Sequence, residues 1–384
     1  MPASDLRIAL FSGNYNYVRD GANQALNRLM ATALAAGAQV RVYSPTTDKP
    51  AFEPVGDLVS VPSWHMPGGR GEYRLAKGLS AAVAADLRRF APTIVHVSAP
   101  DILGHSAVRW ARRHGVPTIA SHHTRFETYP RYYGIGFTEP LLVWLQKRFY
   151  NRFDQVMVPS RSVGDLLASW GVTAPIGTWA RGINHQRFNP GRRDEAWRQG
   201  LGIGPDEVAV GFLGRLVLEK GLDVFADVIA ELKRRGVRHR VLVIGEGPAR
   251  PWFAEHVPEA VFTGFQAGDD LGRATAGMDI FFMPSVTESF GNVTCEAMAA
   301  GVPVVAARAT GNVDLVEDGV TGFLVEPTDI AGYADAIGAL IADPARRRAA
   351  GQAGHARVLD YDWEKVNGAM IAAYRALLER RRAT

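Results

Sequence analysis

The sequence has a single cysteine, Cys295, and lacks any long apolar run. One cysteine rules out a disulfide within the chain and suits a reducing compartment. Because no run of about 18 apolar residues is present, we expect no membrane-spanning helix. The first residues lead straight into a strand signal without the basic and apolar segments of a secretory signal, so we expect no export.

Further absences narrow the function. No long Lys/Arg run or known reader motif is present, so we expect no nucleic-acid partner. No cluster of His, Cys and Asp has metal-ligand spacing. Asp360-Tyr-Asp362 has the form of an Asp-x-Asp metal motif, but its place before the last predicted helix favours a capping role. We therefore predict no essential metal and no cofactor.

The composition fits two globular domains. The 384 residues are 47% hydrophobic and 21% charged, which suits two sizeable cores. The net charge of +4 hides an asymmetry, because residues 1–190 carry 21 Lys and Arg against 12 Asp and Glu, whereas residues 191–384 carry 22 against 27. We expect the basic first half to meet an anionic surface.

Short apolar runs alternate with helical stretches along the whole chain. This alternation predicts an α/β protein with two Rossmann-like, doubly wound parallel sheets. A Gly- and Pro-rich stretch from Gly182 to Pro205 marks the boundary. We predict an N-terminal domain over residues 1–185, a second domain over 186–361 and a last helix over 362–384. The strand signals are Arg7–Phe11, Gln39–Tyr43, Ile94–Val97, Thr118–Ala120, Val156–Pro159, Val208–Leu213, Arg240–Ile244, Ala260–Phe262, Ile280–Met283, Val304–Ala306 and Phe323–Val325.

Two carboxylates frame a predicted helix start at Glu288-Ser-Phe-Gly-Asn-Val-Thr-Cys-Glu296. Gly291 at the start lets a diphosphate approach the free backbone N–H groups, and the helix dipole favours negative charge there. Glu296 lies four residues after Asn292, so both share one helix face. A carboxylate beside a phosphate site is suited to accept hydrogen bonds from sugar or ribose hydroxyls. The alternative is a helix capped by Ser289 with a solvated Glu296.

A second motif, Gly214-Arg215-Leu-Val-Leu-Glu-Lys220-Gly221, follows a buried strand signal. Doubly wound sheets bind ligands at the carboxyl ends of their strands. Arg215 as a planar fork and Lys220 as a point charge match a diphosphate leaving group. The alternative is two solvated charges before a helix.

Together these motifs resemble the donor-binding domain of retaining family-4 glycosyltransferases. The resemblance is specific over 208–325, where Gly-Arg…Lys-Gly, the Glu-x7-Glu pair and Glu-Ala-Met-Ala-Ala-Gly-x-Pro-Val-Val are all present. It implies a GT-B fold, with two Rossmann-like domains facing a cleft, and a last helix that returns to the first domain.

The resemblance also implies roles for the residues of both motifs. Arg215 and Lys220 would bind the diphosphate of the donor, and Glu288 would contact the transferred sugar. Glu296 would hold the ribose. The backbone and side-chain donors of the diphosphate would come from Ser289, Phe290, Gly291 and Asn292.

The first domain carries two further candidates. His123, in Ser-His-His-Thr after a strand signal, matches the His-Thr of the family, which implies that it orients donor and acceptor. Gly21 stands before a predicted helix where the family usually has two glycines, and its N–H would reach the phosphates. Asp20 departs from that pattern.

Gly245 and Gly247 follow a strand signal, but the rest of Gly-x-Gly-x-x-Gly is missing, so a nicotinamide site is not indicated. We place them near the base and ribose of the donor.

The acceptor is indicated by a segment rich in basic and aromatic residues, 125–153, which suits an anionic membrane interface. The segment and the loop 64–74 resemble the lipid-directed branch of family 4, including sulfolipid synthases and the mannosyl- and glucuronosyltransferases of diacylglycerol. The alternative is an ordinary amphipathic helix over 140–153.

The sequence-based hypothesis is a retaining hexosyltransferase at the cytoplasmic membrane face. Its donor would be GDP-mannose first, with UDP-glucuronate or UDP-glucose next, and its acceptor a membrane lipid. Two rivals remain, a nucleotide-sugar 2-epimerase of the same architecture and a binding protein without catalysis. A glycosyltransferase with a soluble acceptor is a further alternative.

Overall fold

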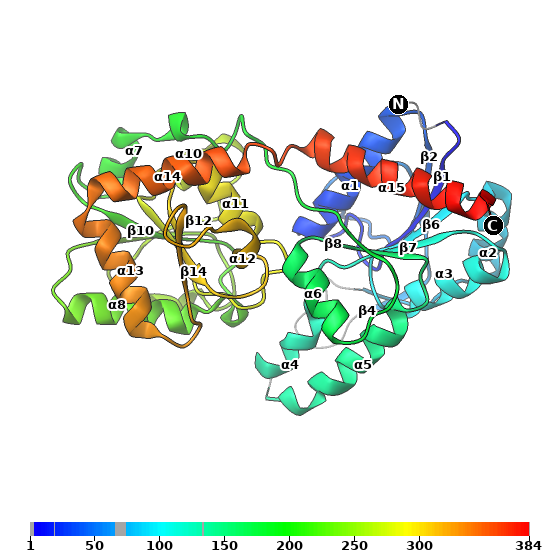
Figure 1. The fold of residues 1–384 in the computed structure, drawn as a ribbon, viewed down its shortest axis with the longest axis horizontal. Helices are drawn as coiled ribbons and strands as arrows, with labels where there is room; N and C mark the ends of the chain where they lie inside the picture. Colours follow the sequence, from blue (N-terminus) through cyan, green and yellow to red (C-terminus); the bar gives the residue numbers. More distant parts are fainter. Residues whose placement is uncertain (1–3, 19, 66–73, 133, 384) are drawn as a thin grey trace. The chain divides into compact units, whose positions relative to one another are not determined.

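The computed structural model describes residues 4–18, 20–65, 74–132 and 134–383. The chain forms two compact units (Figure 1). Unit 1 comprises Met1–Glu127, Phe137–Arg181 and Trp363–Thr384, and unit 2 comprises Thr128–Gly136 and Gly182–Asp362. The predicted domain boundaries, residues 1–185 with the last helix 362–384 and residues 186–361, stay a prediction.

The described residues of unit 1 form a seven-stranded parallel sheet in the order β3-β2-β1-β6-β7-β8-β9. The chain winds outward from β1 in both directions, so the strand order reverses between β1 and β6. Such a reversal is the place where doubly wound sheets bind ligands. The strands are β1 (Arg7–Phe11), β2 (Gln39–Ser44), β3 (Asp57–Ser60), β6 (Ile94–Val97), β7 (Thr118–Ser121), β8 (Gln155–Val158) and β9 (Ile176–Thr178).

Helices cover both faces of this sheet (Figure 1). Ile8 and Leu10 of β1 pack in the core below α1 and α15, while Ala9 and Phe11 pack with α2, α3, α5 and α6. A strand buried on both faces needs a continuous apolar run, which explains the signal at residues 7–11. The helices are α1 (Gly21–Ala35), α2 (Ala81–Phe90), α3 (Ile102–Arg113), α5 (Glu139–Tyr150), α6 (Arg161–Ser169) and α15 (Trp363–Ala383).

A short antiparallel pair, β4 (Ser63–His65) and β5 (Arg74–Ala76), stands apart from this sheet. The predicted acceptor loop joins these two strands, and its residues 66–73 lie outside the described residues, as do Arg19 and Tyr133.

The described residues of unit 2 form a six-stranded parallel sheet in the order β12-β11-β10-β13-β14-β15, with its reversal between β10 and β13. Helices α8 and α13 lie on one face and α10, α11 and α14 on the other (Figure 1). The strands are β10 (Ala209–Leu213), β11 (Arg240–Ile244), β12 (Val261–Gly264), β13 (Ile280–Met283), β14 (Val304–Ala307) and β15 (Gly322–Val325). The helices are α4 (Tyr129–Tyr132), α7 (Glu195–Gly200), α8 (Leu222–Arg234), α9 (Arg250–His256), α10 (Gly268–Ala276), α11 (Asn292–Ala299), α12 (Asn312–Leu315), α13 (Ile330–Ala342) and α14 (Pro344–Val358).

The predicted fold class, two doubly wound parallel sheets in an α/β protein, is confirmed. Each predicted strand signal overlaps a strand of one of the two large sheets, while β3 and β9 were not predicted. Within the described residues, no helix is both long and apolar enough to cross a membrane.

Candidate functional site

The loop after β10 presents two cations at the point where the strand order of unit 2 reverses. Gly214 continues the strand with φ 147°, and Arg215 is exposed. A 3-10 turn, Leu218–Lys220, leads to Gly221, whose left-handed conformation (φ 72°) starts α8 without a side-chain cap. A side chain at Gly221 would lie 3.1 Å from the backbone of Pro284, so a glycine is required on both counts.

The loop after β13 lies beside the loop after β10 and leads into α11. Gly291 is the N-cap residue in the left-handed region (φ 90°), and no side chain caps the helix. The first N–H groups of α11 are therefore unpaired by a cap, as a phosphate site requires. Phe290 is buried, and its ring lies 5.6 Å from that of Tyr361. Gly291, and not Ser289, caps the helix, so the alternative of a Ser289 cap is wrong.

Lys220 and Glu288 form an ion pair across the two loops. Their Nζ and Oε1 atoms are 2.5 Å apart, with 27% of the lysine and 10% of the glutamate side chain exposed. The pair joins residues 68 positions apart because β10 and β13 are hydrogen-bonded neighbours. It leaves Arg215 as a net positive charge, and the second carboxylate oxygen of the mostly buried Glu288 lies outside the pair.

Glu296 lies on α11 in a setting that disfavours its charged form. Burial raises its pKa to about 7, and the positive charge of Arg187 acts in the opposite sense. Asn292 on the same helix face has a buried Oδ1 that accepts no hydrogen bond from the described residues. A buried Asn292 Oδ1 without a donor among the described residues and a buried Glu296 on the same helix face fit a hydroxyl-bearing ligand.

Arg187 was missed by the sequence analysis. It lies on the turn that follows unit 1 in the chain, where its backbone N–H donates to Oδ1 of Asn184 at 3.0 Å. Its Nε is buried without an acceptor among the described residues. A side chain at Gly272 of α10 would lie 2.2 Å from the Arg187 carbonyl, so the turn packs closely on that helix. The only sequence signal was one arginine in a loop, which is too common to single out.

Gly245 and Gly247 have a structural reason to be glycine. A Cβ at Gly245 would lie 2.0 Å from the carbonyl oxygen of Gly214, and one at Gly247 would lie 2.3 Å from that of Leu216. The loop after β11 thus lies against the loop that carries Arg215. The role of both glycines beside the base and ribose stays a prediction.

Gly21 is the first residue of α1 in unit 1. Asp20 caps this helix, with its Oδ1 accepting from the Asn23 N–H at 2.8 Å, and burial raises the pKa of Asp20. A phosphate at Gly21 would compete with this carboxylate. Its predicted phosphate contact remains untested.

His123 follows β7 and has both ring nitrogens engaged. Nε2 lies 2.7 Å from the Ser121 hydroxyl and Nδ1 lies 2.8 Å from the Arg181 guanidinium. Burial and the positive charge of Arg181 lower its pKa well below the usual value. The catalytic role predicted for His123 is also untested.

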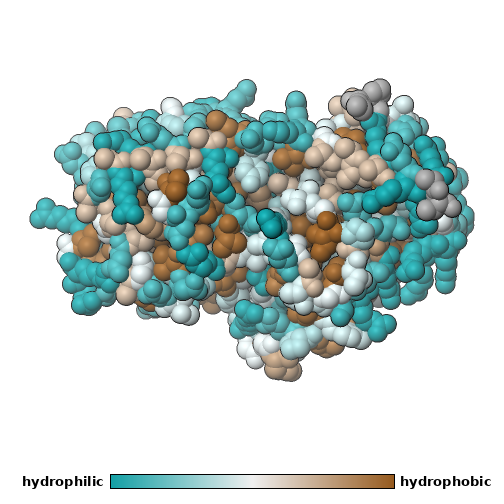
Figure 2. All heavy atoms as spheres, in the orientation of Figure 1, coloured by the Kyte–Doolittle hydropathy of each residue, from teal (hydrophilic) through white to brown (hydrophobic). Residues whose placement is uncertain are grey.

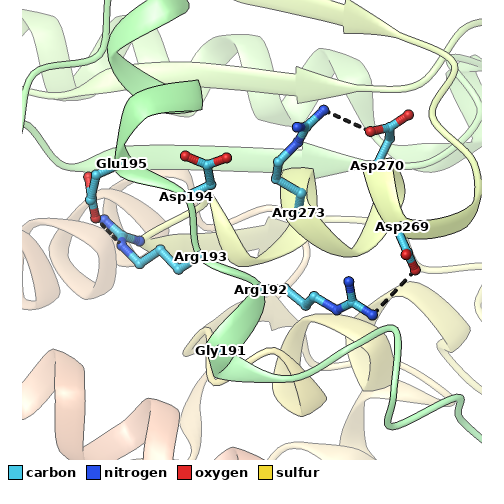
Figure 3. Close-up of a pocket in the computed structure, with 8 residues that line it drawn as sticks. All are labelled: Gly191, Arg192, Arg193, Asp194, Glu195, Asp269, Asp270 and Arg273. Atoms are coloured by element: carbon cyan, nitrogen blue, oxygen red, sulfur yellow. Dashed lines mark hydrogen bonds and ion pairs between the residues drawn. The ribbon is translucent and has the colours of Figure 1, made fainter.

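A hollow on the surface of unit 2 is a poor donor site. Its charges pair among themselves, as Figure 3 shows for Arg192 with Asp269 (3.3 Å), Arg193 with Glu195 (2.5 Å) and Arg273 with Asp270 (2.7 Å). None of the predicted site residues lines it. Its lining is Gly191, Arg192, Arg193, Asp194, Glu195, Asp269, Asp270 and Arg273. Among the described residues, no group of three His, Cys, Asp or Glu could hold a metal ion.

Comparison with known proteins agrees with this architecture. Residues 19–187 match the family model of Glycosyltransferase Family 4, and residues 207–343 match that of Glycosyl transferases group 1. The sulfoquinovosyl transferase of Arabidopsis thaliana is 35% identical over 299 residues, which are 75% of this chain and 58% of that protein. A GDP-mannose-dependent alpha-mannosyltransferase of Mycolicibacterium smegmatis is 31% identical over 386 residues, covering 98% of this chain and 99% of that protein.

A solved structure supports the fold. Sucrose-phosphate synthase from Thermosynechococcus elongatus superposes with a TM-score of 0.76 at 22% identity and covers 97% of this chain and 99% of its own. The fold and the sequence matches define a glycosyltransferase of the GT-B fold. The chain belongs to the glycosyltransferases whose N-terminal half is of family 4 and whose C-terminal half is of group 1.

Proposed function

We propose that this glycosyltransferase moves a hexose from a nucleotide-diphosphate sugar to a membrane lipid with retention of anomeric configuration. GDP-mannose is the first candidate donor, and UDP-glucuronate and UDP-glucose are the next. The GDP-mannose-dependent relative supports mannose as the transferred sugar, and the exposed apolar side chains beside Arg148 on α5 support a lipid acceptor. The soluble acceptor remains the alternative.

The single observation that carries this proposal is the pair of loops at the strand reversal of unit 2. One loop holds Arg215 and Lys220, and the other leads into the uncapped N-terminus of α11. Two cations and free N–H groups together match the charge and the acceptor oxygens of a diphosphate. Glu288 then faces the sugar and Glu296 the ribose.

The proposed chemistry places the developing charges on these groups. The bond between the sugar C1 and the diphosphate oxygen breaks while C1 bonds the acceptor hydroxyl oxygen on the same face. The hydroxyl proton goes to the departing diphosphate, so no protein base is needed. Arg215 and Lys220 stabilise the negative charge on the leaving group, and Glu288, with one oxygen on Lys220, offers its other oxygen to the oxocarbenium-like sugar.

We further propose that transfer needs no metal ion. The protein's own cations and backbone donors would supply the electrostatic stabilisation that Mg²⁺ supplies in other transferases. Activity should therefore survive excess EDTA. Complete loss that Mg²⁺ or Mn²⁺ restores would overturn this part of the proposal and return Asp360 and Asp362 to consideration.

The proposed acceptor side is the exposed stripe of α5 in unit 1. Leu141, Trp144 and Leu145 are 56%, 49% and 43% exposed, and the Arg148 guanidinium lies 4.8 Å from the Trp144 ring centroid. Figure 2 shows apolar atoms reaching the surface over the α5 region, between hydrophilic ones. Apolar anchors beside a cation suit an anionic lipid surface.

Two residues expected at this interface are placed elsewhere. Phe149, which lies in the basic and aromatic segment 125–153, is 1% exposed and packs edge-on against His105 with ring centroids 4.8 Å apart, so it does not belong to the exposed surface of α5. Arg152 donates to the Nδ1 of His105 at 3.2 Å and is partly buried. Aromatic residues occur on both faces of α5, and the sequence alone did not separate the core face from the exposed one.

The experiment is incubation with labelled GDP-mannose, UDP-glucose and UDP-glucuronate, each with a lipid extract and with a soluble sugar. Label in the lipid phase supports the proposal, and label in the soluble sugar supports the alternative. A changed sugar that remains on its nucleotide would indicate the epimerase. A thermal-shift screen finds the donor first, because a ligand at 100 times its Kd adds about 2.7 kcal/mol of stability.

A further inference from the structure

A chain of hydrogen bonds runs through the core of unit 1 and ends on His123. The Tyr374 hydroxyl of α15 lies 2.6 Å from Nδ1 of His96, whose Nε2 lies 2.7 Å from the Ser121 hydroxyl. The same hydroxyl lies 2.7 Å from Nε2 of His123. The Nδ1 of His123 lies 2.8 Å from Nη2 of Arg181, at the far end.

Arg181 decides where the proton of His123 sits. A guanidinium has only donors, so the Nδ1 that faces it must accept. A neutral imidazole with an accepting Nδ1 carries its proton on Nε2, where it donates to Ser121. A protonated His123 would place two donors against each other at 2.8 Å. The geometry therefore leaves one protonation state and one tautomer.

Arg181 is itself held in place. Its side chain is 5% exposed, its Nη1 donates to the Trp179 carbonyl at 2.9 Å, and its guanidinium lies 4.7 Å from the Trp179 ring centroid. Among the described residues it forms no ion pair with a carboxylate. Burying a cation without a carboxylate costs free energy. The hydrogen bonds of Arg181, including the one to His123, must therefore compensate for its burial.

We propose that Arg181 is a positioning residue that holds His123 as a neutral Nε2–H imidazole, so that the ring fixes the loop after β7 and does not transfer protons. This inference deepens the proposed function and rests on it where activity is concerned. It fits a reaction in which the leaving diphosphate takes the acceptor proton. It agrees with the predicted role of His123 in orienting donor and acceptor, and it adds that the ring transfers no proton.

The groups around His123 make the consequence measurable with pH. The titratable and charged groups that act on it are Arg181, His96 and His122, all of which lower its pKa. Burial also lowers the pKa values of His96 and His122 to about 3, so both are neutral at pH 7. Removing Arg181 takes away the one fixed charge and frees Nδ1 to bind a proton.

The test is ¹⁵N NMR of the imidazole rings in the wild type, Arg181→Met, Arg181→Lys and Ser121→Ala. Lysine is also only a donor, so Arg181→Lys should keep the Nε2–H tautomer. Ser121→Ala should keep it too, because Arg181 still faces Nδ1. Arg181→Met should lose the single tautomer and let His123 titrate at higher pH than in the wild type.

Kinetics separate this role from simple support of the fold. Arg181→Met should lower kcat on the order of 10- to 100-fold through misplacement of the loop, with a new loss of activity toward acid pH that Arg181→Lys does not show. An Nδ1–H tautomer in the wild type, or an unchanged His123 in Arg181→Met, would overturn the inference. Failure of the proposed function would instead appear as no transfer by any variant, while the NMR result stands by itself.

Discussion

The two units share one architecture, but the helices at the strand reversal begin differently in each. In unit 1, α1 and α3 begin after β1 and β6, and Asp20 and Asp101 cap them by accepting N–H groups at 2.8 and 2.7 Å. In unit 2, α8 and α11 begin after β10 and β13, at Gly221 and Gly291, with no side-chain cap. Unit 1 thus fills these helix N-termini with its own carboxylates, and unit 2 leaves them open.

This difference supports the proposed diphosphate site in unit 2. The N–H groups of a helix start attract either a carboxylate or a phosphate, so an internal carboxylate cap competes with an anionic ligand. Burial raises the pKa of Asp101 to about 6, which shows that its carboxylate is poorly hydrated. In unit 2 no side chain caps the helices that begin at Gly221 and Gly291, and in the proposed site Arg215 and Lys220 add positive charge for a diphosphate.

The largest expected effect is the loss of the unit 2 cations. Arg215→Ala and Lys220→Ala should each reduce kcat on the order of 10² or more, because their contacts strengthen as the diphosphate departs. Both side chains lie in a surface loop, so the fold should persist. The measurement is turnover with circular dichroism, and Lys233→Ala, a 56% exposed residue of α8, is the matched control. Near-normal turnover of both variants would move the diphosphate away from this loop.

Glu296 of unit 2 should lower the stability of the protein at high pH and contribute to donor binding. Its pKa is about 7 in the folded protein against 4.5 as the usual value, so the folded state holds the proton more tightly. Stability from this group is therefore full below pH 4.5 and falls as the pH rises through 7. Glu296→Gln should raise the free energy of unfolding at pH 8 by up to about 3 kcal/mol, with a smaller gain at pH 5. Denaturant unfolding at the two pH values measures this change.

The same substitution should weaken binding of the nucleotide-sugar donor. A charge-assisted hydrogen bond to the ribose contributes about 1.5–3 kcal/mol, so the Kd should rise roughly tenfold or more at pH 8. Wild-type affinity should improve as the pH rises through 7 because the carboxylate accepts the ribose hydroxyls. Calorimetry with GDP and UDP measures both effects, and the exposed Glu255→Gln is the control. Unchanged affinity would remove Glu296 from the site.

Removing a cap in unit 1 tests the other half of the comparison. Asp20→Ala should destabilise the protein by about 1 kcal/mol through loss of the α1 cap. Ser80→Ala removes the cap of α2, where Oγ accepts from the Val83 N–H at 3.2 Å, and should cost a similar amount. Neither change should alter donor affinity. Tighter donor binding by Asp20→Ala alone would place a phosphate at Gly21 and contradict the view that unit 1 excludes anions there.

In unit 1 the sequence predicted the interior of the sheet better than its two edges. Strands such as β6 and β13 are buried on both faces and read as continuous apolar runs. The strands β3 and β9 are short, lie at the two edges of their sheet and are partly exposed, so no such run marks them. Edge strands pair on one side only and need less apolar surface.

The site was predictable where residues are close in sequence and not where the fold brings them together. The glycine at the start of α11 and the cations after β10 follow from local patterns. The ion pair between Lys220 and Glu288 depends on the adjacency of β10 and β13, and the pairing of Arg181 with His123 joins residues 58 positions apart. Burial is what marks Arg181 and Arg187 as candidate site residues, and the sequence around an isolated arginine in a loop does not predict burial.

The smallest expected effect concerns the surface of unit 1. Residues 1–190 carry all of the excess positive charge, and Arg148 is exposed beside Trp144 on α5. One cation near an anionic membrane contributes about 1 kcal/mol, so Arg148→Gln should weaken vesicle binding about fivefold at low salt. The exposed Arg112→Gln on α3 is the matched control.

Co-sedimentation with anionic and neutral vesicles at low and high salt measures this binding. Salt should weaken it without abolishing it, because Leu141, Trp144 and Leu145 add apolar contact that salt does not screen. Replacing Trp144 with Ser should therefore reduce the part that survives high salt, whereas Arg148→Gln should reduce the part that salt removes. Arg152 is a poor target for the same test, since it pairs with His105 inside the unit. Negligible binding to both vesicle types would remove the lipid surface from the proposal and favour a soluble acceptor.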